Sequence, residues 1–299
     1  MATVAPNQPT PAHQLKPFLK STLDETITNQ GSPIPRGPVQ SELVFYKAPA
    51  DGATPYNYVE TPPAGTPQRN YGEHHQTVTL NDIRGRESSF TLQNNAFQTV
   101  GGIASAEKDF DDDEHIKQVY YPEVEKLILD NVPGAYRVLL FDHTIRRSSP
   151  NAKRAPVTRA HIDQTPKSAE TRVRYHLPEE ADELLRGRYR IINVWRPLNG
   201  PVVAHPLGFA DSSSVRDEDL VGVEHRYPHR TGETAGVKHR DGQNWYYWSG
   251  MTNDERLFLQ CSDSDSDTRR VPHTAFVDPR TPDGAPGRES IEVRALVFG

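Results

Sequence analysis

Short runs of apolar residues, alternating with polar ones or continuous, recur along the chain between clusters of Pro, Gly and Asp. Such runs predict β-strands, because a half-buried strand is apolar on one face and a fully buried strand is apolar throughout. They are densest in the last third of the chain. The expected strands cover residues 43–46, 76–80, 97–100, 136–142, 190–195, 244–248, 256–260, 273–277 and 290–298.

Two segments have helical spacing instead. Residues 113–129 place apolar residues three and four positions apart behind an acidic start, and Pro122 is expected to divide this segment into two helices. Residues 177–185 carry Pro178 and acidic residues early and end before Gly187, an order typical of a helix. Few helices among many short strands indicate a mainly β fold with flanking helices, of the jelly-roll kind.

The chain has 299 residues, a length that suits one large all-β domain, and residues 41–299 are expected to form it. Residues 1–40 have a different composition, rich in Pro, Thr, Gln and Asn. We therefore expect a loosely ordered N-terminal arm ahead of a single jelly-roll domain.

Charge and composition exclude several classes of function. The net charge is −6 and no long block of Lys or Arg occurs, so nucleic acid is not an expected partner. No apolar stretch is long enough to span a membrane, and the first residues lack the apolar core of a signal peptide. The single cysteine, Cys261, cannot form an intrachain disulfide and is expected to fill a small apolar space. These features favour a cytoplasmic protein with a small-molecule substrate, and a homodimer is one expectation for its assembly.

Residues 160–164, AHIDQ, carry a candidate metal site. Residues i and i+2 of a strand project to the same face, so His161 and Asp163 are expected to enter one cavity while Ile162 faces away. Two histidines and one carboxylate occupy one face of an octahedral Fe(II), which leaves three positions for a bidentate 2-oxo acid and O2. His273 is the best candidate for the third ligand, because it opens a distant expected strand and precedes a candidate anion-binding group.

That group begins with Arg288 and Ser290 at the start of the last expected strand. The co-substrate 2-oxoglutarate presents a carboxylate at the end opposite its chelating oxo acid, and the arginine fork meets a carboxylate bidentately. Ser290 can add a hydroxyl donor. Arg294 shares the face of Arg288 if the strand is regular, so spacing alone leaves open which arginine takes the carboxylate.

A structural interpretation competes with this one. His-x-Asp arises often by chance, and a hydrogen-bonded His161 at a strand edge with Asp163 as a turn cap explains the pattern equally well. The distant histidine and the Arg-x-Ser triplet add weight to the metal interpretation. His225 and His229 have the spacing of a helical zinc pair, but Pro228 lies between them and no Glu follows His225, so no zinc helix is expected there.

Several segments, in order from residue 119 to the C-terminus, resemble a fungal family of iron-dependent hydroxylase/desaturases. The family includes gibberellin desaturase-like enzymes, AsaB-type hydroxylase/desaturases and proteins related to the cephamycin methoxylation component CmcJ. The matching segments are VYYPE (119–123), FDHTIRR (141–147), AHIDQT (160–165), IINVWRPL (191–198), NWYYW (244–248), VPHTAF (271–276) and RESIEVRALVF (288–298).

The resemblance implies a double-stranded β-helix and an Fe(II)/2-oxoglutarate-dependent dioxygenase. It also implies iron at His161, Asp163 and His273, with Arg288 or Arg294 anchoring the 2-oxoglutarate. The expected reaction is hydroxylation, desaturation or oxidative cyclisation of a small secondary metabolite. The resemblance is specific for the family but does not indicate the substrate.

The segment 191–198 adds two candidate residues. If Asn193 and Trp195 face inward, Asn193 is expected to donate a hydrogen bond to an iron-bound carboxylate, and Arg196 to orient the co-substrate or substrate. In the alternative, Trp195 packs in the core and Arg196 forms a surface ion pair.

Two other functions share the same ligand set. One is a cupin-like isomerase or hydrolase that uses the metal without oxygen chemistry, and the other is a metal-binding module without turnover. Succinate formation that requires iron and substrate distinguishes the oxygenase from the first. Loss of both iron affinity and activity in His161→Ala argues against the second.

Overall fold

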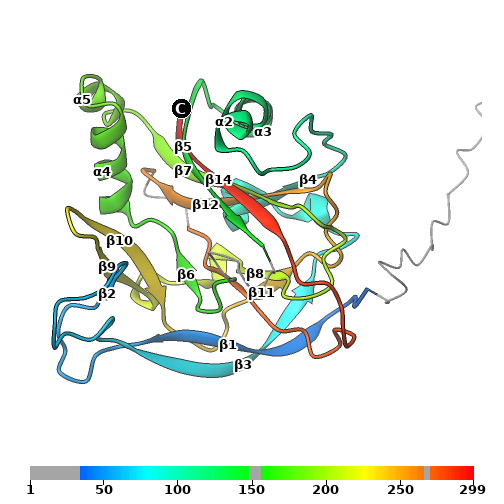
Figure 1. The fold of residues 1–299 in the computed structure, drawn as a ribbon, viewed down its shortest axis with the longest axis horizontal. Coiled ribbons are helices and arrows are strands. Elements are labelled where there is room, and N and C mark those ends of the chain that lie inside the picture. Colours follow the sequence, from blue (N-terminus) through cyan, green and yellow to red (C-terminus); the bar gives the residue numbers. More distant parts are fainter. Residues whose placement is uncertain (1–33, 148–155, 266–269) are drawn as a thin grey trace, which may run out of the picture.

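Strands dominate the regular structure of this protein (Figure 1). The computed structural model describes residues 34–147, 156–265 and 270–299. Most of the expected arm therefore lies outside the described residues, and its last two residues already begin β1. The strands are β1 (Val39–Lys47), β2 (Tyr56–Tyr58), β3 (Gly72–Asp82), β4 (Phe97–Val100), β5 (Arg137–Arg146), β6 (His161–Ile162), β7 (Tyr189–Pro197), β8 (Leu207–Ala210), β9 (Leu220–Arg226), β10 (Thr231–Val237), β11 (Trp245–Tyr247), β12 (Arg256–Asp263), β13 (His273–Ala275) and β14 (Ser290–Phe298).

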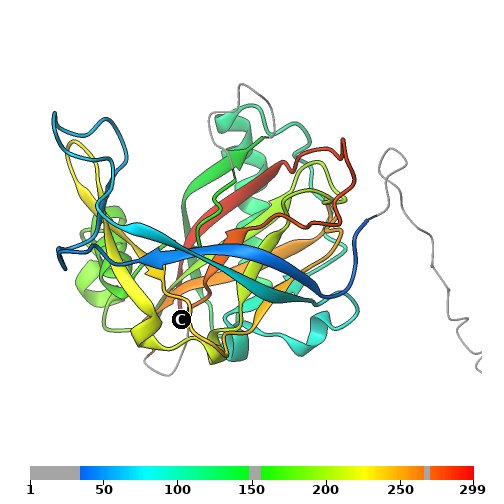
Figure 2. The same ribbon diagram turned by 90° about the horizontal axis from the view of Figure 1, so that it is seen from below.

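The strands form two sheets. The nine-stranded sheet has the order β1-β3-β11-β8-β13-β6-β10-β9-β2, and the five-stranded sheet has the order β4-β12-β7-β14-β5. Pairing is antiparallel except between β3 and β11 and between β2 and β9. Figure 2 shows the long paired strands β1 and β3 crossing the molecule side by side. Two curled, mainly antiparallel sheets enclosing a core are the expected jelly roll.

Alternation along the strands divides the core into layers. On β7, Ile191 packs into the cluster between the two sheets, whereas Ile192 and Val194 face the opposite way. There they meet Val124 and Ile128 of helix α3, which covers the outer face of the five-stranded sheet (Figure 1). The inner face is thus left to enclose the space in which a site can form.

The expected helix at 113–129 is one continuous helical segment with a π-helical turn. It comprises α2 (Asp113–His115), η2 (Ile116–Tyr120, the π-helical turn) and α3 (Tyr121–Asn131). Pro122 lies in the first turn of α3, directly after the π-helical turn, and its missing N–H removes one backbone hydrogen bond from the continuous segment. The break expected at this proline is therefore a change of helix type rather than a gap. The short helix α1 (Leu92–Asn95) precedes β4, and the 3-10 turns are η1 (Glu87–Ser89), η3 (Ser212–Ser214) and η4 (Asp217–Asp219).

The expected helix at 177–185 is mostly wrong. Only α5 (Ala181–Leu184) is helical there, and a longer helix, α4 (Pro166–His176), precedes it. Thr165 caps α4 by accepting a hydrogen bond from the Ser168 N–H. The buried residues of α4 are Ser168, Ala169 and Val173. The helix therefore lacks the broad apolar stripe by which a helix is recognised in a sequence.

Candidate metal centre and active-site cavity

Two short strands bring the candidate histidines together. His161 in β6 and His273 in β13 are directly paired across an antiparallel ladder, and their ring centroids lie 4.5 Å apart. Asp163 follows β6, and its Oδ1 lies 3.3 Å from His161 Nε2. One ligand atom from each of the three residues lies within 4.8 Å of the others. The fold therefore brings together the three side chains that the sequence nominated, close enough for one ion.

Hydrogen bonds orient both imidazoles in the same way. Nδ1 of His161 donates to the carbonyl of Arg159 over 2.8 Å, and Nδ1 of His273 donates to the carbonyl of Val271 over 3.3 Å. Because a carbonyl only accepts, each ring carries its proton on Nδ1 and keeps the lone pair of Nε2 available for a metal. This fixing of the tautomer is characteristic of histidine metal ligands.

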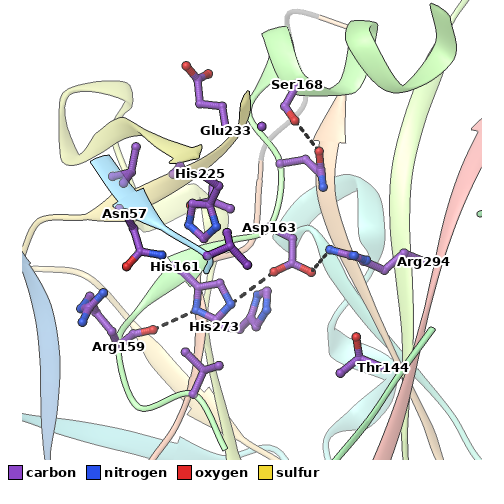
Figure 3. A pocket seen from close by; sticks show the side chains of 18 of the residues that line it. Asn57, Thr144, Arg159, His161, Asp163, Ser168, His225, Glu233, His273 and Arg294 are labelled. Atoms are coloured by element: carbon purple, nitrogen blue, oxygen red, sulfur yellow. Dashed lines mark hydrogen bonds and ion pairs between the residues drawn. The ribbon is translucent and has the colours of Figure 1, made fainter. Parts of the chain in front are cut away.

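The Asp163 carboxylate is held from its other side. Asn193 donates from Nδ2 to Asp163 Oδ2 over 2.9 Å, and Nη1 of Arg294 lies 3.6 Å from the same oxygen. Figure 3 shows the carboxylate between His161 on one side and Arg294 on the other. One oxygen thus faces the histidines while the other is engaged by the five-stranded sheet, an arrangement that suits a metal bond through one oxygen.

The protonation states also fit a metal. Burial would raise the pKa of Asp163, but the adjacent His161 and the charge of Arg294 hold it well below its usual range. Burial, and after it the neighbouring His161, lowers the pKa of His273 to about 4. A neutral imidazole and an ionised carboxylate are the forms that bind metal, so His273 and Asp163 are in their metal-binding forms at neutral pH.

The triad lines a cavity of about 700 Å³ that also contains Arg288. Arg288 is buried, with its guanidinium 5.2 Å from the centroid of the Trp195 ring. Burial and the charge of Arg146 lower its pKa to about 10, so it remains a cation at neutral pH. A buried cation in the same cavity as the triad suits the far carboxylate of a dicarboxylic acid.

Arg294 has a different environment from Arg288. Its Nε and Nη2 atoms form a two-pronged ion pair with Asp142, both contacts being 2.6 Å. The ion pair with Asp142 raises the pKa of Arg294 despite its burial. With this partner on one side and Asp163 on the other, Arg294 is placed to hold the candidate iron ligand.

Two of the predicted residues do not reach the cavity. Arg196 lies on the opposite face of β7, where its guanidinium is 4.9 Å from the Phe110 ring centroid and 5.5 Å from that of Tyr120. It is buried among aromatic rings, so it is neither beside the co-substrate nor in the surface ion pair of the alternative. Ser290 is buried where β14 pairs with Pro197 of β7, and it does not line the cavity either.

The cavity contains functional candidates that the sequence did not nominate. Glu292, half-buried beside Asn193, accepts a hydrogen bond from Asn193 Nδ2 over 3.0 Å. Burial and the charge of Asp163 raise the pKa of Glu292. The sequence could have indicated Glu292, because positions 288, 292 and 294 are all even and side chains at alternate positions of a strand share a face. His225 of β9 also lines the cavity, and its spacing to other histidines gave no hint of this.

Fold and site together define the class: a jelly-roll protein with a two-histidine, one-carboxylate triad open to a cavity, the arrangement of non-heme iron oxygenases. Comparison with known proteins agrees. Residues 43–298 match the model of the Oxidoreductase/YMDC permease-like domain family. The hydroxylase/desaturase poxK of Penicillium oxalicum is 37% identical over 301 residues, covering 89% of this chain and 93% of that protein.

A further relative and a solved structure, both with the name nvfI, carry iron and the co-substrate in their descriptions. The Fe(II)/2-oxoglutarate-dependent dioxygenase nvfI of Aspergillus novofumigatus is 32% identical, covering 87% of this chain and 96% of that protein. The solved structure of the iron and alpha-ketoglutarate-dependent endoperoxidase NvfI superposes with a TM-score of 0.80 at 30% identity, covering 89% and 99% of the two chains. This chain belongs to the family of fungal iron- and 2-oxoglutarate-dependent hydroxylase/desaturases and dioxygenases, as its sequence motifs predicted.

The helices of the described residues are short. None of those in residues 34–147, 156–265 and 270–299 combines the length and the hydropathy of a membrane span. The longest, α3 and α4, have 11 residues each.

Proposed function

We propose that this protein uses Fe(II), 2-oxoglutarate and O2 to oxidise an unactivated C–H bond of a small secondary metabolite, with His161, Asp163 and His273 as the iron ligands. The observation that carries the proposal is the convergence of one donor atom from each residue within 4.8 Å, on the wall of a cavity of about 700 Å³. Iron bound there with its co-substrate and O2 would supply the oxidising power for the C–H bond.

The remaining residues of the site position the iron ligand Asp163 and bind the co-substrate. Asn193 and Arg294 hold Oδ2 of Asp163, which leaves Oδ1 directed at the histidines. Arg288 is the proposed anchor for the far carboxylate of 2-oxoglutarate, because Arg294 is already engaged by Asp142. Trp195 beside Arg288 provides an apolar wall that strengthens such an ion pair by excluding water.

The outcome of the oxidation depends on how the substrate lies against the triad. The names of the relatives include hydroxylase/desaturase and endoperoxidase, so related sites perform different reactions. In each case the protein's task is to fix which C–H bond faces the metal and to keep water away from it.

Anaerobic titration with Fe(II) and 2-oxoglutarate tests the proposal. The expected result is a visible metal-to-ligand charge-transfer band, which His161→Ala abolishes. Arg174→Gln is the matched control, because Arg174 is exposed, pairs with Glu170 and Asp182, and does not line the cavity. A folded wild-type protein that binds iron but shows no band would contradict the co-substrate assignment, and the cupin-like alternative would replace it.

A cytoplasmic location and a homodimer, both expected from the sequence, stay predictions. Cell fractionation checks the first, and light scattering on the purified protein checks the second.

A further inference from the structure

Helix α4 has two faces with different surroundings. Ala169 and Val173 pack into the core between the sheets. The residues at spacing i, i+3, i+4 and i+7 on the other face line the cavity instead. These are Ser168, Thr171, Arg172 and Tyr175. An ordered helix face directed into an open cavity is a surface suited to a ligand.

The β9–β10 hairpin contributes a second wall of the same cavity. In Figure 1 it lies beside α4, and Figure 3 shows Ser168 of α4 and Glu233 of β10 at one end of the cavity, with His161 and Asp163 further in. The hairpin also brings Tyr227 and Arg230 to the lining. A molecule held between α4 and this hairpin would therefore extend toward the triad.

The described part of the lining contains six arginines, which differ in their partners. Arg159 is paired with Glu73 over 2.9 Å, and Arg294 with Asp142 over 2.6 Å. For Arg172 and Arg230, in contrast, no carboxylate of the described residues lies within the 4.0 Å of an ion pair. The arginines are Arg146, Arg159, Arg172, Arg230, Arg288 and Arg294.

Arg172 and Arg230 contact aromatic rings rather than acids. The guanidinium of Arg172 lies 5.0 Å from the Phe141 ring centroid, and that of Arg230 lies 4.0 Å from the Tyr227 ring centroid. Burial lowers the pKa of Arg172, and the charges of Arg294 and Arg230 lower it further. Neighbouring like charges favour an anion beside them, the more so at Arg172, which is half-buried.

Apolar side chains are exposed at the same place. Six large apolar residues of the described chain are exposed, and three of these line this cavity: Val59 at 43%, Val157 at 36% and Tyr175 at 72%. Because these three exposed apolar side chains line the same cavity, we do not expect a purely polar ligand there. Exposed apolar surface of this kind marks a binding surface.

We infer that α4 and the β9–β10 hairpin recognise an organic acid, whose carboxylate pairs with Arg172 and Arg230 and whose apolar skeleton lies against Val59, Val157 and Tyr175. This inference rests on the proposed function and names the substrate class of the same site. With the carboxylate held by these two arginines, the apolar skeleton is the part left for oxidation at the triad.

Equilibrium dialysis with decanoate and its uncharged counterpart decanamide tests the inference. The enzyme is loaded anaerobically with Fe(II) and saturating 2-oxoglutarate, so that decanoate cannot occupy the co-substrate site. We expect wild type to bind decanoate more tightly than decanamide. Arg172→Gln should weaken decanoate binding about tenfold, the size of one charge-assisted hydrogen bond, and leave decanamide binding unchanged. Arg230→Gln should have the same sign and a smaller effect, because Arg230 is exposed. Arg174→Gln on the same helix should change neither.

Three results would overturn the inference: equal binding of the two probes by wild type, an equal loss of both probes in Arg172→Gln, or loss of the charge-transfer band in that variant. The last would move Arg172 to the 2-oxoglutarate site. Failure of the proposed function is separate, because it appears as a missing band in wild type, and the preference for decanoate is then measured without co-substrate.

Discussion

The two faces of the strand pair β7–β14 are adjacent in sequence and opposite in character. The inner face carries Asn193, Glu292 and Arg294, which are linked by hydrogen bonds and charge to Asp163. The outer face carries residues such as Ile192 and Val293, packed beneath helix α3. Neighbouring positions along either strand therefore have different roles, since side chains alternate with a period of two. One position contributes to the site, and the next packs in the core. Substitutions on the two faces should affect different measurements.

The largest expected effect concerns the triad itself, whose Asp163 is held by the inner face through Asn193 and Arg294. His273→Ala removes one of three donors that converge within 4.8 Å. Iron binding and turnover should fall to background, because two ligands do not hold Fe(II) in this geometry. Iron content after anaerobic loading, with circular dichroism as the control for folding, measures this. A variant that keeps full iron occupancy would remove His273 from the site.

The next prediction distinguishes the roles of Arg288 and Arg294. Arg288→Gln should raise the KM for 2-oxoglutarate about 10- to 100-fold, as expected for a lost charge-assisted contact, with iron affinity unchanged. Arg294→Gln should instead lower iron affinity about 10- to 100-fold, the usual cost of removing a partner of a metal ligand. Steady-state kinetics and iron titration on both variants decide the assignment. The reversed pattern would exchange the two roles.

A smaller effect is expected on the outer face. Ile192 is fully buried beneath the helical layer. Ile192→Val should lower the free energy of unfolding by about 1 kcal/mol through the lost methylene and its cavity, with kcat and iron affinity unchanged. Denaturant titration beside the activity assay tests this. A change in iron affinity without a change in stability would mean that the two faces are not independent.

The smallest effect concerns the loop that covers Arg196 on that outer face. Glu107 is buried, and its Oε1 accepts hydrogen bonds from the N–H groups of Asp109 and Phe110. Burial alone would raise its pKa, but these N–H groups and His115 lower it below the ordinary 4.5. Because the folded-state pKa is lowered, this stabilisation is complete above pH 4.5 and is lost as the pH falls through the folded-state value.

Thermal unfolding between neutral pH and pH 3 should therefore show a shallower acid-dependent loss of stability in Glu107→Gln than in wild type. Glu114→Gln serves as the control, since Glu114 is exposed and pairs with Lys117. Identical pH profiles for wild type and Glu107→Gln would contradict this account.

The sequence by itself determined most of the strands, although not β2, β8, β9 or β10, together with the jelly roll, the family and the three residues that converge in the candidate iron site. These features depend on local rules: alternation along a strand, the spacing of His161 and Asp163, and motif residues that can be recognised without knowing their neighbours. Arg288 and Arg294 could also be proposed from the sequence, because their spacing of six residues gives them the same parity at and just before the last strand.

Only the tertiary structure decided how those residues are used. Arg196 faces Phe110 and Tyr120 rather than the cavity, and Arg294 is committed to Asp142 of β5, a pairing over 152 positions. The lining of α4 was equally hidden, since a helix face that lines a cavity needs no apolar stripe. Partners of this kind come from segments distant in sequence, and an arginine's role depends on which acid reaches it once the chain has folded.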